Sequence, residues 1–303
     1  MAWADYTVTS WLRQGWEYVR FGMAFFVLRQ DKPYVLGLVT NDTCNLHCVH
    51  CHVANVDHVN MPYFQIQTIL TQNYKKGVRF LYLEGGEPYL WRDGDYRLKD
   101  VVRLAHEIGY LRVHIYTNGT VKMDAAPDYT WISIDGLGDV YRTIRGIPLE
   151  HVLNNIRTYK GRRGIVYTVN TINYRHISEF LTFIHRELPG IRVMFYFHTP
   201  YYGIDPLLLS KVQRVEAIDT IFECKRAKQP VMNSFAGLKA MASGEYFHPT
   251  NLWRVIDSTG EYQCCRAFGN PDVCENCGYS TCAEITLARN WRMGPISQLM
   301  RAY

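Results

Sequence analysis

Apolar and polar positions alternate along most of the chain in a pattern that predicts strands followed by amphipathic helices. Short runs rich in β-branched and aromatic residues, most of them ending at Gly, Asn, Asp or Pro, predict strands. There are six such runs, at 34–40, 78–83, 111–116, 129–134, 165–169 and 191–197. Helical periodicity predicts the helices between them, at about 63–76, 98–108, 149–159 and 177–188.

Strands joined by helical crossovers predict an α/β fold around a parallel sheet. We expect a partial TIM-type (β/α)6 barrel, with an open doubly wound sheet as the alternative. The predicted divisions are an N-terminal amphipathic helix at 1–33, the barrel at 34–223 and a C-terminal extension at 224–303. Further helices are predicted at about 207–222, before the extension, and at 234–242, within it. The composition of the extension then changes to Cys, Gly, Asn and Pro, which predicts a small metal-organised cysteine-rich module at 263–284.

The first 33 residues combine Trp, Phe and Arg in an amphipathic pattern. One interpretation is a cap on the barrel, and the other is a surface that touches a membrane or an apolar substrate. The apolar run at 19–28 is shorter than the roughly 20 residues that span a bilayer, and no signal-peptide cleavage pattern follows it. We therefore expect a cytoplasmic protein without a transmembrane span, with peripheral membrane contact left open.

Composition narrows the class of protein further. The 303 residues are 48% hydrophobic, and 33 basic against 28 acidic side chains leave a formal charge of +5, which indicates a globular chain. No basic stripe interleaved with aromatic residues is present, so nucleic-acid binding is not expected. The nine cysteines fall mainly into two tight groups, which favours metal or redox chemistry over disulfides.

The first cysteine group, Cys44, Cys48 and Cys51, directly follows the first predicted strand with the spacing CxxxCxxC. Thiolates at this density ligate a soft metal, and three thiolates on an iron–sulfur cluster leave one iron open to another ligand. The alternative is a tetrahedral zinc site completed by a histidine of the same loop, His47, His50 or His52.

Three further motifs follow the next three predicted strands. They are Glu84-Gly-Gly-Glu-Pro88, Thr117-Asn-Gly-Thr120 and Ser133-Ile-Asp135-Gly136. Together with CxxxCxxC, and in this order, they resemble the radical S-adenosylmethionine (SAM) enzymes over about residues 34–200. The resemblance implies that Cys44, Cys48 and Cys51 hold a [4Fe-4S] cluster whose open iron is chelated by SAM.

The same resemblance implies a SAM pocket. Gly85, Gly86 and Glu87 would meet the SAM amino group, while Pro88 stiffens the exit from the motif. Arg145 would meet the methionine carboxylate, for which a forked guanidinium is suited; a solvated arginine is the alternative. The other candidates are ribose or methionine contacts at Ser133 and Asp135, and weaker ones at Asn118 and Asn170, which could equally serve ordinary turns.

The resemblance also implies an activity. An electron from a flavodoxin- or ferredoxin-type donor cleaves SAM reductively to methionine and a 5′-deoxyadenosyl radical, which abstracts hydrogen from a substrate or adds to it. We expect an unidentified small-molecule, apolar, lipid-like or peptide-like substrate, and the short N-terminal segment argues against a leader-peptide-binding domain. The chain resembles, more loosely, hopanoid-biosynthesis radical enzymes. The alternative function is a non-enzymatic iron–sulfur or zinc-binding electron-transfer protein.

The second cysteine group resembles the abbreviated auxiliary-cluster module called twitch. It comprises Cys264, Cys265, Cys274, Cys277 and Cys282. A second, auxiliary iron–sulfur cluster is expected, with a structural zinc or unligated cysteines as alternatives. Either Cys264 or Cys265 would be the ligand. Even with Cys224 added, the cysteines are too few for two fully thiolate-ligated auxiliary clusters.

Overall fold

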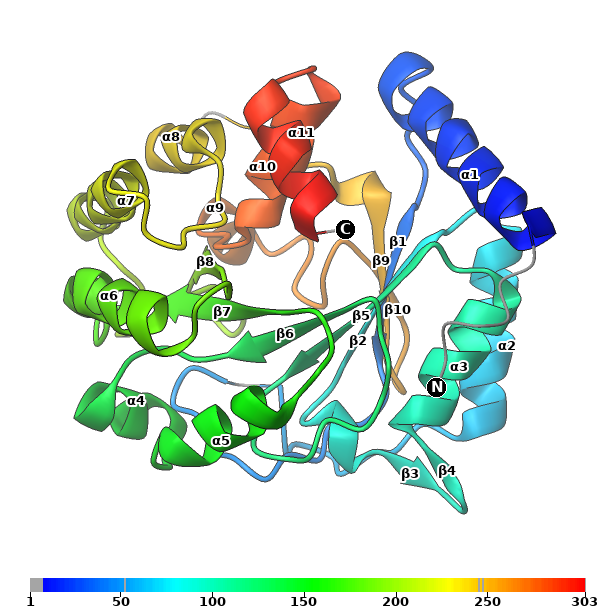
Figure 1. Ribbon diagram of the computed structural model, residues 1–303, viewed down its shortest axis with the longest axis horizontal. Helices are drawn as coiled ribbons and strands as arrows, with labels where there is room; N and C mark the ends of the chain where they lie inside the picture. Colours follow the sequence, from blue (N-terminus) through cyan, green and yellow to red (C-terminus); the bar gives the residue numbers. More distant parts are fainter. Residues whose placement is uncertain (1–7, 52, 245, 247, 303) are drawn as a thin grey trace.

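The structure is a computed structural model that describes residues 8–51, 53–244, 246 and 248–302; the first seven residues of the predicted N-terminal helix lie outside them. Within these residues the main sheet has eight strands in the order β10-β9-β1-β2-β5-β6-β7-β8 (Figure 1). All six predicted strands are present and mutually parallel, so the prediction of a partial α/β barrel is confirmed. They are β1 (Val35–Val39), β2 (Phe80–Glu84), β5 (Arg112–Thr117), β6 (Tyr129–Ser133), β7 (Arg163–Val169) and β8 (Val193–Phe197).

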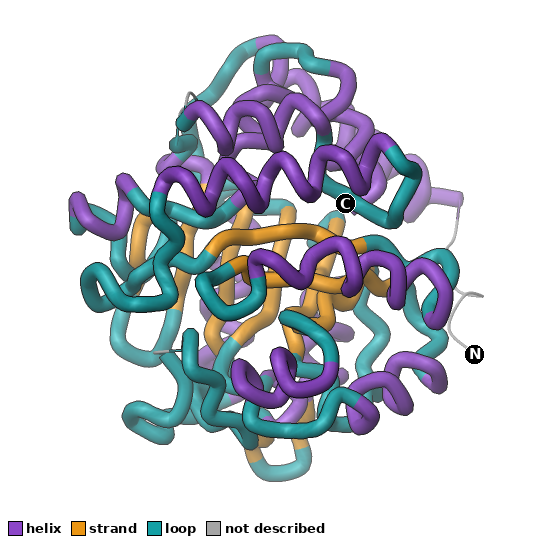
Figure 2. The backbone as a smooth tube through the Cα atoms, turned by 90° about the vertical axis from the view of Figure 1, so that its left-hand side faces the viewer, coloured by secondary structure: helices purple, strands orange, loops and turns teal. Residues whose placement is uncertain are grey.

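Helices occupy the crossovers except that between β5 and β6, and they surround the strands on the outside (Figure 2). The crossover helices are α2 (Tyr63–Lys75), α3 (Leu98–Ile108), α4 (Gly138–Arg145), α5 (Glu150–Thr158) and α6 (Ile177–Glu187). Of these, the short α4 was not predicted. Smaller elements are the hairpin β3 (Arg92–Asp93) and β4 (Tyr96–Arg97), and the 3-10 turns η2 (Pro88–Leu90) and η3 (Tyr174–His176).

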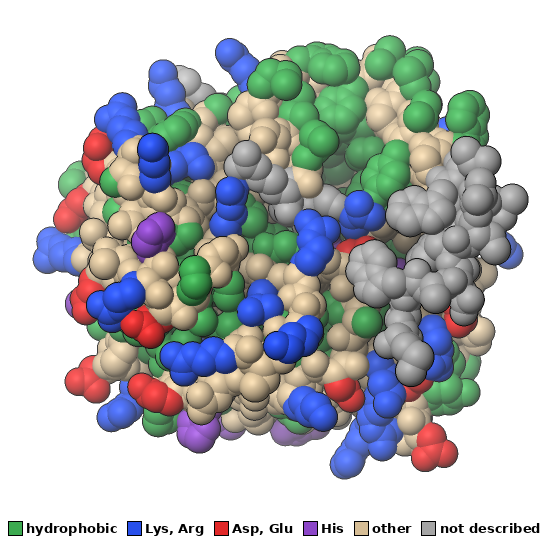
Figure 3. Space-filling model, in the orientation of Figure 1, with side chains coloured by type: hydrophobic (Ala, Val, Ile, Leu, Met, Phe, Trp, Pro, Cys, Tyr) green, Lys and Arg blue, Asp and Glu red, His purple; other side chains and the backbone are tan. Residues whose placement is uncertain are grey.

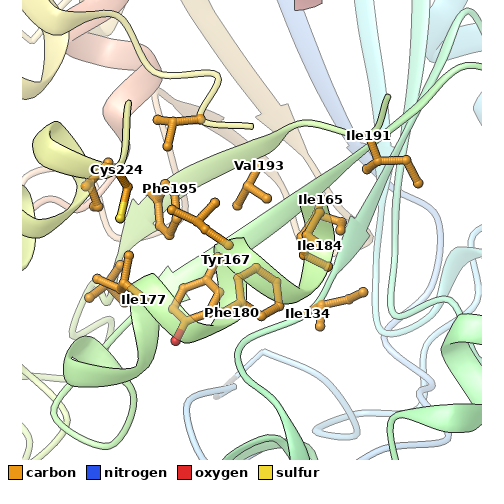
Figure 4. Close-up of a cluster of buried hydrophobic side chains, with 14 of the residues drawn as sticks. Ile134, Ile165, Tyr167, Ile177, Phe180, Ile184, Ile191, Val193, Phe195 and Cys224 are labelled. Atoms are coloured by element: carbon orange, nitrogen blue, oxygen red, sulfur yellow. The ribbon is translucent and has the colours of Figure 1, made fainter. Parts of the chain in front are cut away.

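The core between the second half of the sheet and its helices is aromatic and aliphatic (Figure 4). Tyr167 of β7 packs against Phe180 of α6 and Phe195 of β8, with ring centroids 4.7 and 5.4 Å apart. Cys224 of α7 (Lys211–Arg226) is buried in the same cluster. Cys224 is therefore a packing residue, separate from the cysteine-rich module.

The helix α1 (Val8–Gly22) and the π-helical turn η1 (Met23–Val27) cover the amino ends of the strands. Phe21 contacts Phe80 at the start of β2, with ring centroids 4.9 Å apart, so this segment caps the barrel. Its outer side exposes Met23 and Val27. Hydrophobic side chains gather there and over α10 and α11 at the top of Figure 3. Among the described helices, none combines the length and the apolar character needed to cross a bilayer.

The C-terminal extension adds elements that the sequence did not predict. After α8 (Phe235–Ser243) and η4 (Thr250–Leu252), β9 (Trp253–Ile256) pairs in parallel with β1, and β10 (Glu261–Gln263) runs antiparallel to β9. The described sheet thus has two strands beyond the expected six. Three helices complete the extension: α9 (Pro271–Glu275), α10 (Ser280–Arg289) and α11 (Met293–Ala302).

The extension also contacts the opposite edge of the sheet. The amide of Phe197, at the end of β8, donates to the carbonyl of Gly278 at 2.9 Å, and the Gly278 amide donates to the Thr199 hydroxyl at 3.0 Å. A Cβ atom on residue 278 would overlap the backbone of Phe197. The extension therefore bridges the two edges of the partial barrel, β1 through β9 and β8 through Gly278.

Candidate functional site

The four motifs singled out in the sequence lie at one edge of the sheet. The cysteine loop follows β1, the glycine motif follows β2, the Thr117 motif begins at the end of β5, and Ser133 ends β6. Because these strands are parallel neighbours, their carboxyl ends meet at the same face of the barrel. The fold therefore brings the predicted metal ligands and the predicted SAM contacts together.

Two polar residues shape the cysteine loop. A carboxylate oxygen of Asp42 accepts hydrogen bonds from three successive backbone amides, those of Val56, Asp57 and His58, at 2.6–3.1 Å. The side-chain oxygen of Asn55 accepts from the Cys44 amide at 2.8 Å. The sequence analysis did not select Asp42 or Asn55, although such loop-capping roles are typical of Asp and Asn.

The thiols of the loop face hydrogen-bond donors. The Sγ of Cys44 lies 3.4 Å from the Leu46 amide nitrogen and 3.6 Å from Nδ2 of Asn118, and the Sγ of Cys48 lies 3.8 Å from a guanidinium nitrogen of Arg145. Burial raises the pKa of Cys44 to about 11 and also raises that of Cys48. Metal ligation requires the thiolate, and N–H donors stabilise sulfur-centred negative charge. The loop therefore fits a thiolate-ligated cluster.

The histidines of the loop have other neighbours. The Nε2 of His47 lies 3.4 Å from Nδ2 of Asn55, and the Nε2 of His50 lies 3.9 Å from a carboxylate oxygen of Asp135. His52, the third candidate for a zinc site, lies outside the described residues. These contacts give the zinc alternative no further support.

Gly85 and Gly86 allow the end of β2 to approach the cysteine loop. A Cβ on Gly85 would overlap the Asn41 carbonyl oxygen, and one on Gly86 would overlap those of Asp42 and Thr43. Neither glycine has a positive φ. The close approach that the glycines permit is thus to the chain's own backbone, and a SAM contact at these residues stays a prediction. Pro88, which follows, is buried at the start of η2.

Glu87 is completely buried and holds the turn after β5. Its carboxylate accepts hydrogen bonds from the Asn118 amide at 2.7 Å, the Thr117 hydroxyl at 2.8 Å and the Tyr89 amide at 3.1 Å. Burial raises the pKa of Glu87 to about 7, against the opposing effect of these donors. The side chain positions the surrounding loops, and its contact with the SAM amino group stays a prediction.

Asn118 and Asn170 both serve turns. The side-chain oxygen of Asn118 accepts from the Thr120 amide at 2.9 Å, while its Nδ2 donates to Oδ1 of Asn45 at 2.9 Å. The side-chain oxygen of Asn170 accepts from the Ile172 amide at 2.9 Å. Asn118 in addition contacts the cysteine loop, whereas the described contacts of Asn170 lie within its own turn and the neighbouring backbone.

Asp135 and Arg145 form a buried ion pair beside the cysteines. The Nε of Arg145 donates to Oδ2 of Asp135 at 2.6 Å, and Oδ1 of Asp135 accepts from the Thr168 amide at 2.7 Å. The proximity of Asp135 raises the pKa of Arg145 despite burial, so the guanidinium stays charged. Arg145 is therefore not the solvated arginine that the sequence left as an alternative. Ser133, partly buried, ends the preceding strand.

The second cysteine group is spread over the extension: Cys264 and Cys265 follow β10, Cys274 lies on α9, and Cys277 and Cys282 lie near the carboxyl end of β8. Cys277 precedes Gly278, and Cys282 is buried on α10. His248, which the sequence analysis did not select, joins them: the donor atoms of His248, Cys277 and Cys282 all lie within 4.8 Å of one another. Because His248 precedes η4, well upstream of these cysteines, no sequence motif pointed to it.

A cavity of about 240 Å³ lies between the cysteine loop and the hairpin formed by β9 and β10. Its wall includes Asp42 and Val56 from the loop, and Asp257, Tyr262 and Arg266 from the extension. The cavity therefore offers both apolar and charged contacts close to the first cysteine group.

A model of the radical SAM superfamily matches residues 38–184, which include the cysteine loop and the motifs after β2, β5 and β6. Residues 38–184 are therefore a radical SAM domain. Members of this superfamily bind a [4Fe-4S] cluster and SAM.

Two curated relatives are similar to the part of the chain that contains this domain. The chain is similar to pre-heme d1 synthase of Dinoroseobacter shibae, with 31% identity over 57% of this chain and 45% of the relative. It is also similar to Fe-coproporphyrin III synthase of Methanosarcina barkeri, with 26% identity over 65% of this chain and 53% of the relative. The chain thus spans about half the length of these curated relatives.

The fold of this radical SAM chain is similar to that of Streptococcus suis SuiB bound to its precursor peptide SuiA. The TM-score is 0.66 at 14% identity, covering 99% of this chain and 73% of the SuiB chain. At this identity the likeness shows the fold alone.

Proposed function

We propose that this protein is a radical SAM enzyme that cleaves SAM reductively at Cys44, Cys48 and Cys51. The observation that carries the proposal is the convergence of these cysteines with the motifs after β2, β5 and β6 at one edge of the sheet. When bound, a [4Fe-4S] cluster supplies the electron that cleaves SAM, so that a 5′-deoxyadenosyl radical can abstract hydrogen from a substrate or add to it.

The chain's own residues orient and shield this site. Glu87 and Asn118 hold the loop after β5 against the cysteine loop, and Gly85 and Gly86 let the two loops approach. Arg145 brings a fixed positive charge to Cys48, where it offsets the negative charge of the thiolate. Ser133, Asp135 and Asn170, at the neighbouring strand ends, stay candidates for contacts with SAM.

The substrate proposed is apolar or peptide-like. Two relatives are named for a heme precursor and a coproporphyrin, and SuiB is bound to a precursor peptide. The cavity beside the cysteine loop, with Val56, Tyr262 and Arg266 in its wall, offers apolar, aromatic and cationic contacts to either class. The same proposal includes a similarity to hopanoid-biosynthesis enzymes. It also includes an electron donor of flavodoxin or ferredoxin type and a cytoplasmic location.

The test is the formation of methionine and 5′-deoxyadenosine by the anaerobically reconstituted protein with SAM and dithionite. The wild type is expected to form both, whereas Cys48→Ala is expected to form neither and to lose the iron of this site. Cys224→Ser, which changes a cysteine in the core, is the control and is expected to retain cleavage. Cleavage by Cys48→Ala would contradict the proposal, and iron binding without cleavage in the wild type would favour the non-enzymatic alternative.

A further inference from the structure

Three donor atoms from separate parts of the extension converge near the end of β8. The imidazole of His248 comes from the segment before η4, the thiol of Cys277 from the turn between α9 and α10, and the thiol of Cys282 from α10. All three atoms lie within 4.8 Å of one another. Imidazole and thiolate together are suited to zinc and iron.

The spacing is close to that of ligands on a single metal ion. Zinc binds sulfur at about 2.3 Å and imidazole nitrogen at about 2.0–2.1 Å, so in tetrahedral coordination two ligand atoms lie about 3.5–3.8 Å apart. Donor atoms within 4.8 Å of one another therefore share one ion after side-chain movements of about 1 Å or less.

The two thiols are carried by well-anchored backbone. Gly278, next to Cys277, is hydrogen-bonded to Phe197 and Thr199 at the end of β8. The helix α10, which carries Cys282, is fixed by Glu284, whose carboxylate accepts from the Ser234 amide at 2.7 Å. Ligands on rigid elements lose little conformational freedom when a metal binds.

We propose that His248, Cys277 and Cys282 are ligands of one metal ion, either a zinc ion or an iron atom of the auxiliary centre. The nearby Cys264 and Cys265, which interact electrostatically with Cys277, are the candidates for a further ligand. This inference rests on the proposed second metal centre and is independent of SAM cleavage. It adds a histidine to a site that the sequence assigned to cysteines alone.

A histidine ligand has chemical consequences that a fourth cysteine would not have. Imidazole is neutral where thiolate is anionic, so each replacement makes the centre less negative. Iron–sulfur centres in which histidine replaces cysteine have higher reduction potentials. If iron occupies the site, the ligand set favours its reduced form.

The test measures iron, zinc and sulfide in the full-length protein and in His248→Ala and His248→Cys. His185→Ala, a change on the exposed side of α6, is the control. We expect His248→Ala to lose the second metal, or to release it to a chelator about tenfold faster or more, and His248→Cys to retain it. Loss of zinc would identify a zinc site, and loss of iron with sulfide would identify a cluster; both support the proposal.

A spectroscopic measurement on the wild type avoids dependence on folding of the variants. The protein is labelled with 15N-histidine and made paramagnetic, either with cobalt(II) in a zinc site or by reduction of the iron centre. Pulsed electron paramagnetic resonance is then expected to show a coordinated histidine nitrogen. Absence of that nitrogen, or metal content and release in His248→Ala equal to those of His185→Ala, would overturn the proposal. SAM cleavage assayed in parallel separates this outcome from failure of the proposed function.

Discussion

Arg145 links the carboxylate of Asp135 to the sulfur of Cys48. Its Nε donates to Asp135 at 2.6 Å, and another nitrogen of the same guanidinium lies 3.8 Å from the Cys48 Sγ. All three side chains are buried. A residue that the family resemblance assigns to the SAM carboxylate thus also neutralises a carboxylate of its own chain.

Arg145→Met is expected to lower the free energy of unfolding by about 3–5 kcal/mol, because it leaves the buried charge of Asp135 unpaired. Urea denaturation of the protein measures the change. Arg142→Met, three residues away on the exposed side of α4, is the control and is expected to shift stability by about 0.5 kcal/mol or less. Equal effects of the two variants would show that the buried pair does not stabilise the fold.

Glu87 is expected to make stability depend on pH. Its pKa is raised to about 7 by burial, from 4.5 in the unfolded chain, so between these values the folded state holds a proton that the unfolded state has lost. The contribution of Glu87 to stability therefore falls as pH rises through this window and levels off above pH 7. Unfolding of the wild type and Glu87→Gln across the window measures this contribution, and the wild type should lose stability relative to the variant as pH rises. A wild type that gains stability relative to the variant would mean that the hydrogen bonds outweigh burial.

Gly86→Ala is expected to displace the cysteine loop, since a Cβ there overlaps the carbonyls of Asp42 and Thr43. The iron bound at Cys44, Cys48 and Cys51 after reconstitution should fall severalfold. Gly15→Ala, in α1 with open space around its Cα, is the control and should leave iron unchanged. Full iron occupancy in Gly86→Ala would show that the loop adapts.

Gly278→Ala is expected to loosen the extension from β8, because the added methyl group overlaps the Phe197 backbone. Overpacking of this kind costs about 1–3 kcal/mol, so limited trypsin digestion of the extension should become about tenfold faster. Gly260→Ala, in the same extension with its nearest neighbour 3.9 Å away, is the matched control. Equal digestion of the two variants would contradict the bridging role of Gly278.

Local pattern was sufficient to predict the barrel strands. Each is a short apolar run, and burial on both faces keeps such runs apolar, as in β1 and β6. By contrast, β9 has four residues, Trp253–Ile256, and its position depends on pairing with β1 across more than 200 residues of chain. Such a long-range pairing leaves no periodic signal in a single sequence.

Side-chain partners were less predictable than motif positions. The sequence placed Glu87 and Asp135 just after strand ends and Arg145 further along the chain, but it did not show that their charges are engaged within the chain. Cys224 could be counted with the tail cysteines until its burial between α6 and β8 was seen. His248 joins the site by tertiary folding alone, as Asp42 and Asn55 join the first loop.

The extension that bridges β1 and β8 is synthesised after the barrel strands. The ribosome makes the chain from its amino end, so the cysteine loop and the six parallel strands are synthesised before β9 and Gly278. Until then β1 lacks its neighbour β9, and the cavity beside the cysteine loop lacks the wall that Asp257, Tyr262 and Arg266 supply. The extension, which is synthesised later, closes this side of the site.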